Sequence, residues 1–116
     1  MDAKQYSINN YVAKIQKLSS EITLELFQRI IICIKSQKRG YFILKKLKGV
    51  HGWCEWDDGI LLDYRKDLVP TIIHECIHLL EPDWSESQVA YAEKRVINTI
   101  NEDDVIKLLM IFVKKL

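Results

Sequence analysis

Cysteine, proline and glycine are scarce in this chain, which has three cysteines, two prolines and four glycines among its 116 residues. No internal repeat or low-complexity linker is present, so we expect one compact domain with a single modest core over 1–116. Cys33, Cys54 and Cys76 are odd in number and widely spaced, which argues against a disulfide framework. We expect these thiols to be reduced and mostly buried, with Cys54 and Cys76 in the core.

Long apolar runs and an excess of one charge are also missing. The longest strictly apolar stretches, such as IIICI at 30–34, are far shorter than a membrane span. Seventeen basic residues against sixteen acidic ones leave a formal net charge of +1, without the basicity usual in proteins that bind a phosphate backbone. We expect a soluble, cytoplasmic protein with no membrane partner, and nucleic acid is not favoured as its partner. The basic residues that gather over 35–48 are interpreted as a solvated edge.

The spacing of apolar residues predicts an α+β fold with a small three-stranded sheet. Helical periodicity predicts an N-terminal helix over 1–19 and a second helix over 20–35 that backs the sheet. β-prone residues predict short strands over 41–47, 53–56 and 60–64. The last two strands are expected to pair as a hairpin, because Asp58-Gly59 between them is a two-residue turn signal.

Two helices that matter for function are predicted after the sheet. Asp67 is a suitable N-cap for the first, which should end near residue 80 because Pro82 cannot continue it. Ser85 and Gln88 have the spacing of a capping box, so the second helix is expected over 86–99.

The sequence HECIH at 74–78 places two histidines in the first of these helices, among isoleucines and leucines. Residues four apart lie on one helix face, so the imidazoles of His74 and His78 should point toward a common spot. Buried imidazoles without partners cost roughly 1–3 kcal/mol each, and a shared metal ion would remove that cost. In the pattern H-E-x-x-H, two histidines bind Zn²⁺ and the glutamate, here Glu75, acts on a zinc-bound water. We therefore expect a zinc site rather than two core histidines satisfied by hydrogen bonds.

A catalytic zinc ion takes three protein ligands and leaves its fourth position to water. Glu81 would lie about 10 Å along the helix axis from His74, too far for one ion to join all three residues. Glu86 and Glu93 both belong to the following helix, and their seven-residue spacing places them on about the same face. Spacing alone does not choose between these two glutamates.

With these features, the stretch TIIHECIHLL and the glutamate-bearing helix that begins at WSE resemble the gluzincin zinc metallopeptidases, in particular their single-domain form, the minigluzincins. The resemblance covers about 20–100 as a catalytic scaffold, and its specific motif is confined to 74–93. It implies roles for individual residues, namely His74 and His78 as metal ligands, Glu75 as general base and acid, and Glu86 as third ligand, with Glu93 as the alternative.

One position departs from the family pattern. Larger gluzincins often carry an acid four residues after the ligand glutamate, where this chain has Ala90. The groups that would orient the metal ligands are therefore not assigned.

The implied function is that of a zinc metalloendopeptidase, which hydrolyses peptide bonds in a peptide or protein substrate. The alternative is a zinc-stabilised binding or regulatory module without catalysis, or a metal-free helical interaction domain. Glu75 favours chemistry, because zinc binding alone does not need it.

Other residues are candidates for lining the cleft. His51 and Tyr91 are possible oxyanion donors, although both residue types more often serve packing. Strand 60–64 or its hairpin partner could bind an extended peptide by strand addition. Three tryptophans either line the cleft or belong to the core or its rim: Trp53, Trp56 and Trp84.

The C-terminal segment 101–116 is predicted to be a helix that Asn101 begins and that is apolar on nearly every face. One packing surface cannot cover such a helix. It is expected either to be wedged into the domain, or to lie across the cleft or exchange with a neighbouring chain, giving a latent, zymogen-like enzyme or a swapped homodimer. The resemblance to minigluzincins also suggests self-inhibition.

Overall fold

The computed structural model describes residues 19–54, 59–65 and 67–116. The N-terminal helix predicted over 1–19 and the hairpin turn before Gly59 lie almost entirely outside these residues. The described part contains four helices and one three-stranded sheet, which confirms the predicted α+β class.

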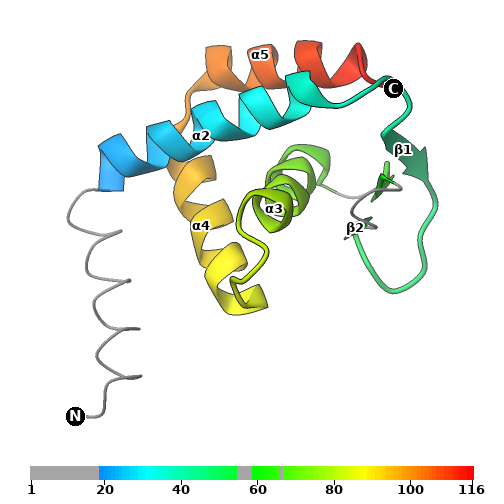
Figure 1. Cartoon of the computed structure of the whole chain (residues 1–116), viewed down its shortest axis with the longest axis horizontal. Coiled ribbons are helices and arrows are strands. Elements are labelled where there is room, and N and C mark those ends of the chain that lie inside the picture. The colour runs from blue at the N-terminus through cyan, green and yellow to red at the C-terminus, as the bar shows by residue number, and fades with distance from the viewer. Residues whose placement is uncertain (1–18, 55–58, 66) are drawn as a thin grey trace.

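The helices follow the predicted order closely, as Figure 1 shows. Their bounds are Ser19–Ser36 for α2, Leu68–Leu80 for α3, Glu86–Thr99 for α4 and Glu102–Val113 for α5. The capping box of Ser85 and Gln88 is present at the start of α4, and Asn101 forms a second one with Asp104 at the start of α5. Asp67 is the N-cap of α3 but makes no side-chain cap bond there. Its carbonyl oxygen instead accepts a 2.7 Å hydrogen bond from the hydroxyl of Thr71.

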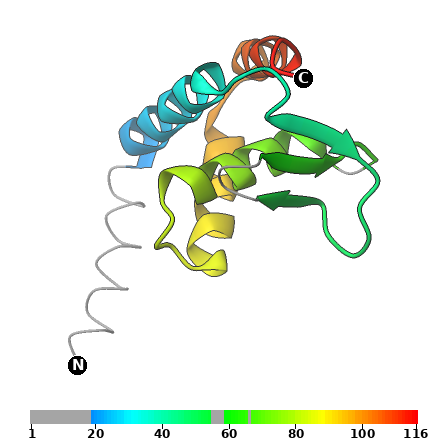
Figure 2. The same cartoon turned by 45° about the vertical axis from the view of Figure 1, so that its right-hand side comes forward.

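The sheet consists of β1 (Phe42–Lys45), β2 (Gly52–Cys54) and β3 (Ile60–Asp63) in the order β1-β3-β2. β2 and β3 are antiparallel, with Trp53 opposite Leu61, as the hairpin signal predicts. β1 pairs with β3 in parallel and therefore lies on the far side of β3 from β2. Figure 2 shows the sheet beside α3, and β2 is an edge strand of that sheet.

The core lies where α2, α3 and the sheet meet. Ile30 and Ile34 of α2, Ile73 and Ile77 of α3, and Ile60 of β3 are all 0 % exposed. Helix α2 packs mainly against α3, α4 and α5, and its buried face belongs to the same core as the sheet.

Helix α5 packs beside α2 and contributes to the same core. Leu108 and Phe112 are buried, and the ring of Phe112 lies 5.3 Å from that of Phe42 in β1. The end of the chain is held by Arg39, whose Nε donates to the carbonyl oxygen of Leu116 at 3.1 Å. The C-terminal segment is thus wedged into the domain along one face and does not cross the front of α3.

A buried carboxylate fixes the loop that follows β1. Asp63, at the end of β3, is fully buried and accepts hydrogen bonds from the backbone N–H of Leu47 at 3.0 Å and from Nη2 of Arg65 at 2.7 Å. The Arg65 guanidinium, aided by backbone donors, holds the pKa of Asp63 well below its ordinary value. This network ties the β1–β2 connection to β3, and that connection leads directly into β2.

The packing of α5 predicts a clear difference between two substitutions. Phe112→Ala should lower the free energy of unfolding by about 3–5 kcal/mol, because it leaves a cavity beside Phe42. Lys107→Ala, at an exposed position of the same helix, should change it by less than about 0.5 kcal/mol. Urea denaturation followed by circular dichroism measures both, and equal effects would show that α5 lies outside the core.

Candidate metal centre

Helix α3 presents its histidines on the side that the core does not cover. Ile73, Cys76 and Ile77 are fully buried, whereas the side chains of His74 and His78 are 19 % and 21 % exposed. Their imidazole rings lie 4.9 Å apart between centroids. The spacing of four residues has therefore brought both rings to one spot, as predicted.

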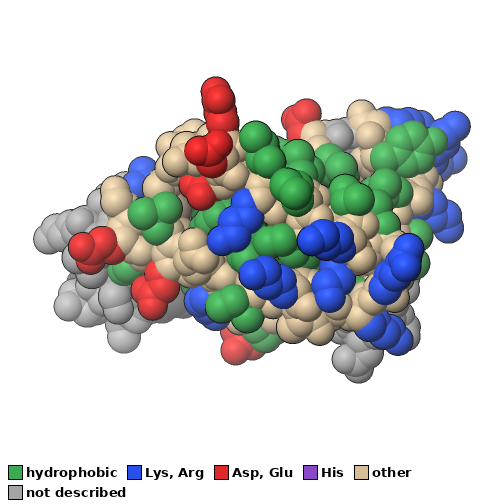
Figure 3. Space-filling model, turned by 90° about the horizontal axis from the view of Figure 1, so that it is seen from above, with side chains coloured by type: hydrophobic (Ala, Val, Ile, Leu, Met, Phe, Trp, Pro, Cys, Tyr) green, Lys and Arg blue, Asp and Glu red, His purple; other side chains and the backbone are tan. Residues whose placement is uncertain are grey.

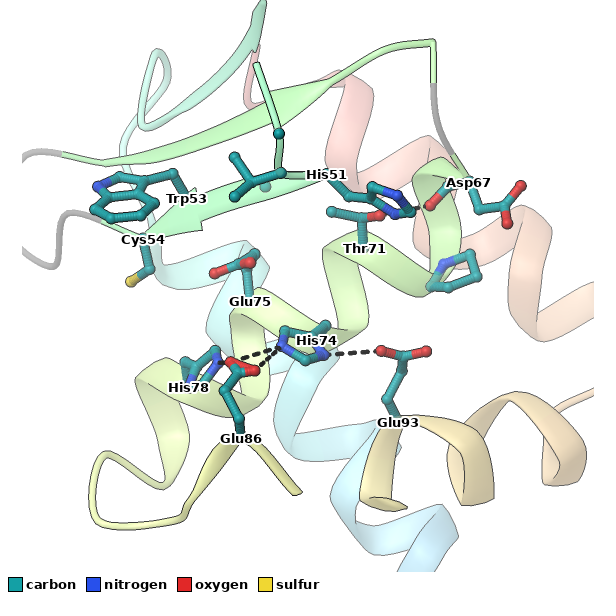
Figure 4. A pocket seen from close by; sticks show the side chains of 14 residues that line it. His51, Trp53, Cys54, Asp67, Thr71, His74, Glu75, His78, Glu86 and Glu93 are labelled. Atoms are coloured by element: carbon teal, nitrogen blue, oxygen red, sulfur yellow. Dashed lines mark hydrogen bonds and ion pairs between the residues drawn. The ribbon is translucent and has the colours of Figure 1, made fainter. Parts of the chain in front are cut away.

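The chain turns back after Glu81 and places Glu86, the first residue of α4, against both rings. Oε1 of Glu86 lies 2.5 Å from Nε2 of His78 and 3.1 Å from Nε2 of His74 (Figure 4). The capping box at Ser85 starts α4 at this residue and so fixes the direction in which Glu86 points.

The three side chains fit a metal ion. One ligand atom each from His74, His78 and Glu86 lies within 4.8 Å of the other two, and this is the group of metal-binding type found among the described residues. A tetrahedral zinc ion with ligand bonds of about 2.0–2.2 Å would hold these atoms about 3.3 Å apart. Small side-chain shifts would produce that geometry. A zinc ion held by these three side chains would keep a fourth position for water.

Glu93 has a different place from Glu86. Its Oε1 accepts a 2.8 Å hydrogen bond from Nδ1 of His74, on the side of the ring opposite the ligand atom. A carboxylate in this position fixes the tautomer of a metal-binding histidine, leaving the lone pair on Nε2, and makes the ligand more basic. Glu93 therefore acts on the ring of His74 in the described arrangement, and Glu86 joins the group that can hold the metal.

The role of Glu93 was not assigned from the sequence, although a signal for it was present. The family pattern directs attention to the residue four positions after the ligand, which is the exposed Ala90. Seven residues make two helical turns, so Glu93 shares a face with Glu86 and reaches the same histidine from further along α4.

Glu75 lies between the histidines in sequence and faces the cleft from the neighbouring side of α3. It is 8 % exposed, and its carboxylate makes no hydrogen bond with any residue that the structure describes. Burial raises the pKa of Glu75, more than His74 and His78 lower it. An unpaired, partly desolvated carboxylate of this kind is suited to accept a proton.

Gly52 of the edge strand lies directly against Glu75. A Cβ atom added at Gly52 would be 3.0 Å from Oε1 of Glu75 and 2.8 Å from Cγ2 of Thr71. Only a residue without a side chain lets the β2 backbone pass this close to the carboxylate. Strand β2 and helix α3 thus form two facing walls.

Between these walls is a cleft of about 740 Å³ that is lined by His74, Glu75, His78, Glu86 and Glu93 (Figure 4). His51 and Trp53 of the β2 wall line it, and Trp53 is 54 % exposed. Cys54 also lines it, and this half-buried residue packs against the core from its edge, whereas Cys76 is fully buried as predicted. Tyr91 is not among the lining residues, and Trp84 packs against the core. Trp56 lies outside the described residues.

The electrostatic setting matches this division of roles. Burial lowers the pKa of His74, but the carboxylates of Glu86 and Glu93 outweigh burial and leave it raised. For Glu86, burial is opposed by hydrogen bonds from His74 and His78, and its pKa is lowered. Negative charge is thus held next to both imidazoles, where a cation would be favoured.

Comparisons with protein-family models, curated proteins and solved structures found no match for the chain. No helix among the described residues is long and apolar enough to cross a membrane.

The geometry predicts a ranking of metal affinities. Glu86→Ala should abolish most zinc binding because it removes a ligand, whereas Glu93→Gln should weaken it by about 10–100-fold because only the support of His74 is lost. Glu81→Ala is the matched control, since this glutamate lies outside the group and pairs with Arg29. Competition with a chromophoric chelator measures the three affinities, and a larger loss for Glu93→Gln than for Glu86→Ala would reverse the assignment.

Proposed function

We propose that this protein is a zinc-dependent hydrolase of peptide bonds, with His74, His78 and Glu86 as metal ligands and Glu75 as general base. The observation that carries the proposal is the position of Glu75. An unpaired carboxylate beside three convergent ligand atoms has no structural task among the described residues, and a purely structural metal site would not need it. The resemblance to minigluzincins agrees with this reading.

In the proposed reaction a zinc ion would supply Lewis-acid chemistry, and side chains of the protein would transfer the proton and orient the ligands. A zinc ion supplies a Lewis acid that acidifies water and polarises a carbonyl group. Glu75 accepts the proton of the attacking water and delivers it to the leaving amine, for which its raised pKa is suitable. Glu93 keeps the ring of His74 in one orientation through both steps. No side-chain nucleophile is required.

The cleft suits an extended peptide. β2 pairs with β3 along one edge only, and the residues of β2 line the cleft. The backbone of a substrate can therefore add to the open edge of β2 as a further strand, which would place a scissile bond over Glu75 because Gly52 lies against that residue. Trp53 offers an exposed apolar surface for a substrate side chain.

The arrangement of α5 bears on latency. No α5 residue is among those lining the cleft, so the described chain does not have the expected arrangement in which segment 101–116 lies across it. A form in which this segment is exchanged between chains stays a hypothesis. Since α5 leaves the cleft uncovered, its position supports activity without removal of the C-terminal segment.

The decisive substitution is Glu75→Gln. It should leave zinc affinity and stability nearly unchanged, because Glu75 is neither a ligand nor hydrogen-bonded among the described residues, and it should lower peptide hydrolysis by at least about 10²-fold through loss of the general base. Hydrolysis of a library of unstructured peptides, followed by mass spectrometry, provides the measurement. Glu81→Gln, at the end of the same helix, is the control and should keep full activity.

Two outcomes would contradict the proposal. Equal hydrolysis by the zinc-loaded wild type and Glu75→Gln would exclude Glu75 as base. A zinc-loaded wild type that cleaves nothing in the library would favour the alternative of a zinc-stabilised binding module.

Gly52→Ala tests the close approach of β2 to Glu75. The new methyl group would lie 2.8 Å from Cγ2 of Thr71 and 3.0 Å from Oε1 of Glu75, well inside van der Waals contact, so the strand or these side chains must move. We expect hydrolysis to fall by about 10-fold or more while zinc affinity stays within a few-fold of wild type, because a displacement of about 1 Å is enough to disturb catalysis. Unchanged activity would show that β2 does not position the reacting groups.

A further inference from the structure

The outer face of the α2 and α5 pair exposes large apolar side chains. Figure 3 looks onto this face, where apolar side chains lie among basic ones. Ile32 of α2 is 64 % exposed, and Ile106, Met110 and Val113 of α5 are 55 %, 60 % and 61 % exposed. Their opposite faces are buried in the core, so both helices are apolar on two sides. We call these four residues the outer apolar stripe.

Charges at the two ends of the stripe have opposite sign. Figure 1 shows α2 and α5 side by side and running in the same direction, with α5 beginning beside the middle of α2 and both helices ending toward the same end of the molecule. Exposed acids lie near both helix starts, namely Glu21, Glu25, Glu102 and Asp103. Exposed bases lie at or just beyond both helix ends, namely Lys35, Lys38, Arg39 and Lys114. Within the described residues none of these eight side chains is in an ion pair.

We propose that this face is the interface of a homodimer in which two copies stack with their helix pairs antiparallel. A two-fold axis that lies in the interface plane, at right angles to the helix axes, places the acidic end of one copy over the basic end of the other, at both ends at once. The two outer apolar stripes then cover each other in the middle. A second copy therefore pairs the acidic end and the basic end with opposite charge and also covers the outer apolar stripe.

Other partners would match only part of this face. An anionic membrane would attract the basic end and repel the acids around Glu21 and Asp103, which lie on the same face. An acidic partner protein would pair with the basic end, but its negative charges would repel the acids near the starts of α2 and α5. The antiparallel order also opposes the dipoles of the stacked helices.

The face has about the size of a small dimer interface. α2 has 18 residues and α5 has 12, which gives lengths of about 27 and 18 Å, and the two helices together are about 20 Å wide. These dimensions give a projected area of roughly 450 Å² per partner, which is below the roughly 800 Å² of a standard interface and is typical of a weak, transient dimer. No residue of α2 or α5 lines the metal cleft, so the dimer leaves the cleft open and is independent of the proposed activity.

Sedimentation equilibrium of the full chain tests the proposal. The wild type should be a dimer, and Met110→Glu should shift it to monomer by placing a charge in the centre of the stripe. Ile43→Glu is the control, because Ile43 is also exposed but lies on β1, away from this face. A monomeric wild type at about 100 μM, near the weak end of specific association, would overturn the proposal. A dimer that both substitutions leave intact would do the same.

Charge reversal gives a test that does not depend on one variant. A chain with Glu21→Lys and Glu25→Lys has basic residues at both ends of α2, and one with Lys35→Glu and Lys38→Glu has acidic residues at both ends of α2. Each should be monomeric alone, with an unchanged circular dichroism spectrum, and the two should form a mixed dimer when combined. If neither variant loses self-association, or if the mixture stays monomeric, the antiparallel interface is wrong. Binding of a monomeric wild type to phosphatidylserine vesicles would instead assign the face to a membrane.

Discussion

Helix α3 has one rotational setting in this fold, and the candidate site depends on it. Ile72, Ile73 and Ile77 are buried against α2, the sheet and α4, and each buried isoleucine contributes roughly 1.5–3 kcal/mol. Rotating α3 by one residue would expose part of this face and bury an imidazole in its place. The apolar face therefore aims His74, Glu75 and His78 into the cleft, with a stabilisation far larger than the cost of holding three polar side chains there.

The second element of the site is the position of α4. Glu81 at the end of α3 pairs with Arg29 of α2 at 3.0 Å, and the capping box at Ser85 starts α4 four residues later. Glu86 consequently meets both histidines, and Glu93, two turns on, meets the far side of His74. The HECIH motif of α3 and the two glutamates of α4 thus lie together, and Glu86 and Glu93 contact different nitrogen atoms of His74.

Local signals in the sequence were enough to predict most of the elements. The capping boxes and Pro82 mark helix ends through interactions between neighbouring residues, and the apolar periodicity of α2, α3 and α4 reports which faces are buried. The four-residue spacing of His74 and His78 likewise predicts their meeting, because one helix fixes it.

Interactions between distant residues could not be predicted in the same way. The parallel pairing of β1 with β3 joins strands that are not consecutive in the chain, and no local pattern records it. The choice between Glu86 and Glu93 depends on how α4 crosses α3, which packing decides. Cys54 packs against the core as predicted but also lines the cleft, because β2 is an edge strand. One side of α5 is exposed because a domain of this size has too little interior to cover a helix on every side.

The central claim is that His74, His78 and Glu86 together form a zinc centre with an open fourth position. X-ray absorption spectroscopy of the zinc-loaded protein tests it most directly. We predict one zinc ion per chain with two imidazoles and only nitrogen and oxygen neighbours at about 2.0–2.2 Å. A sulfur neighbour at about 2.3 Å, which would implicate Cys54 in the cleft, or a folded chain that takes up no zinc, would contradict the account.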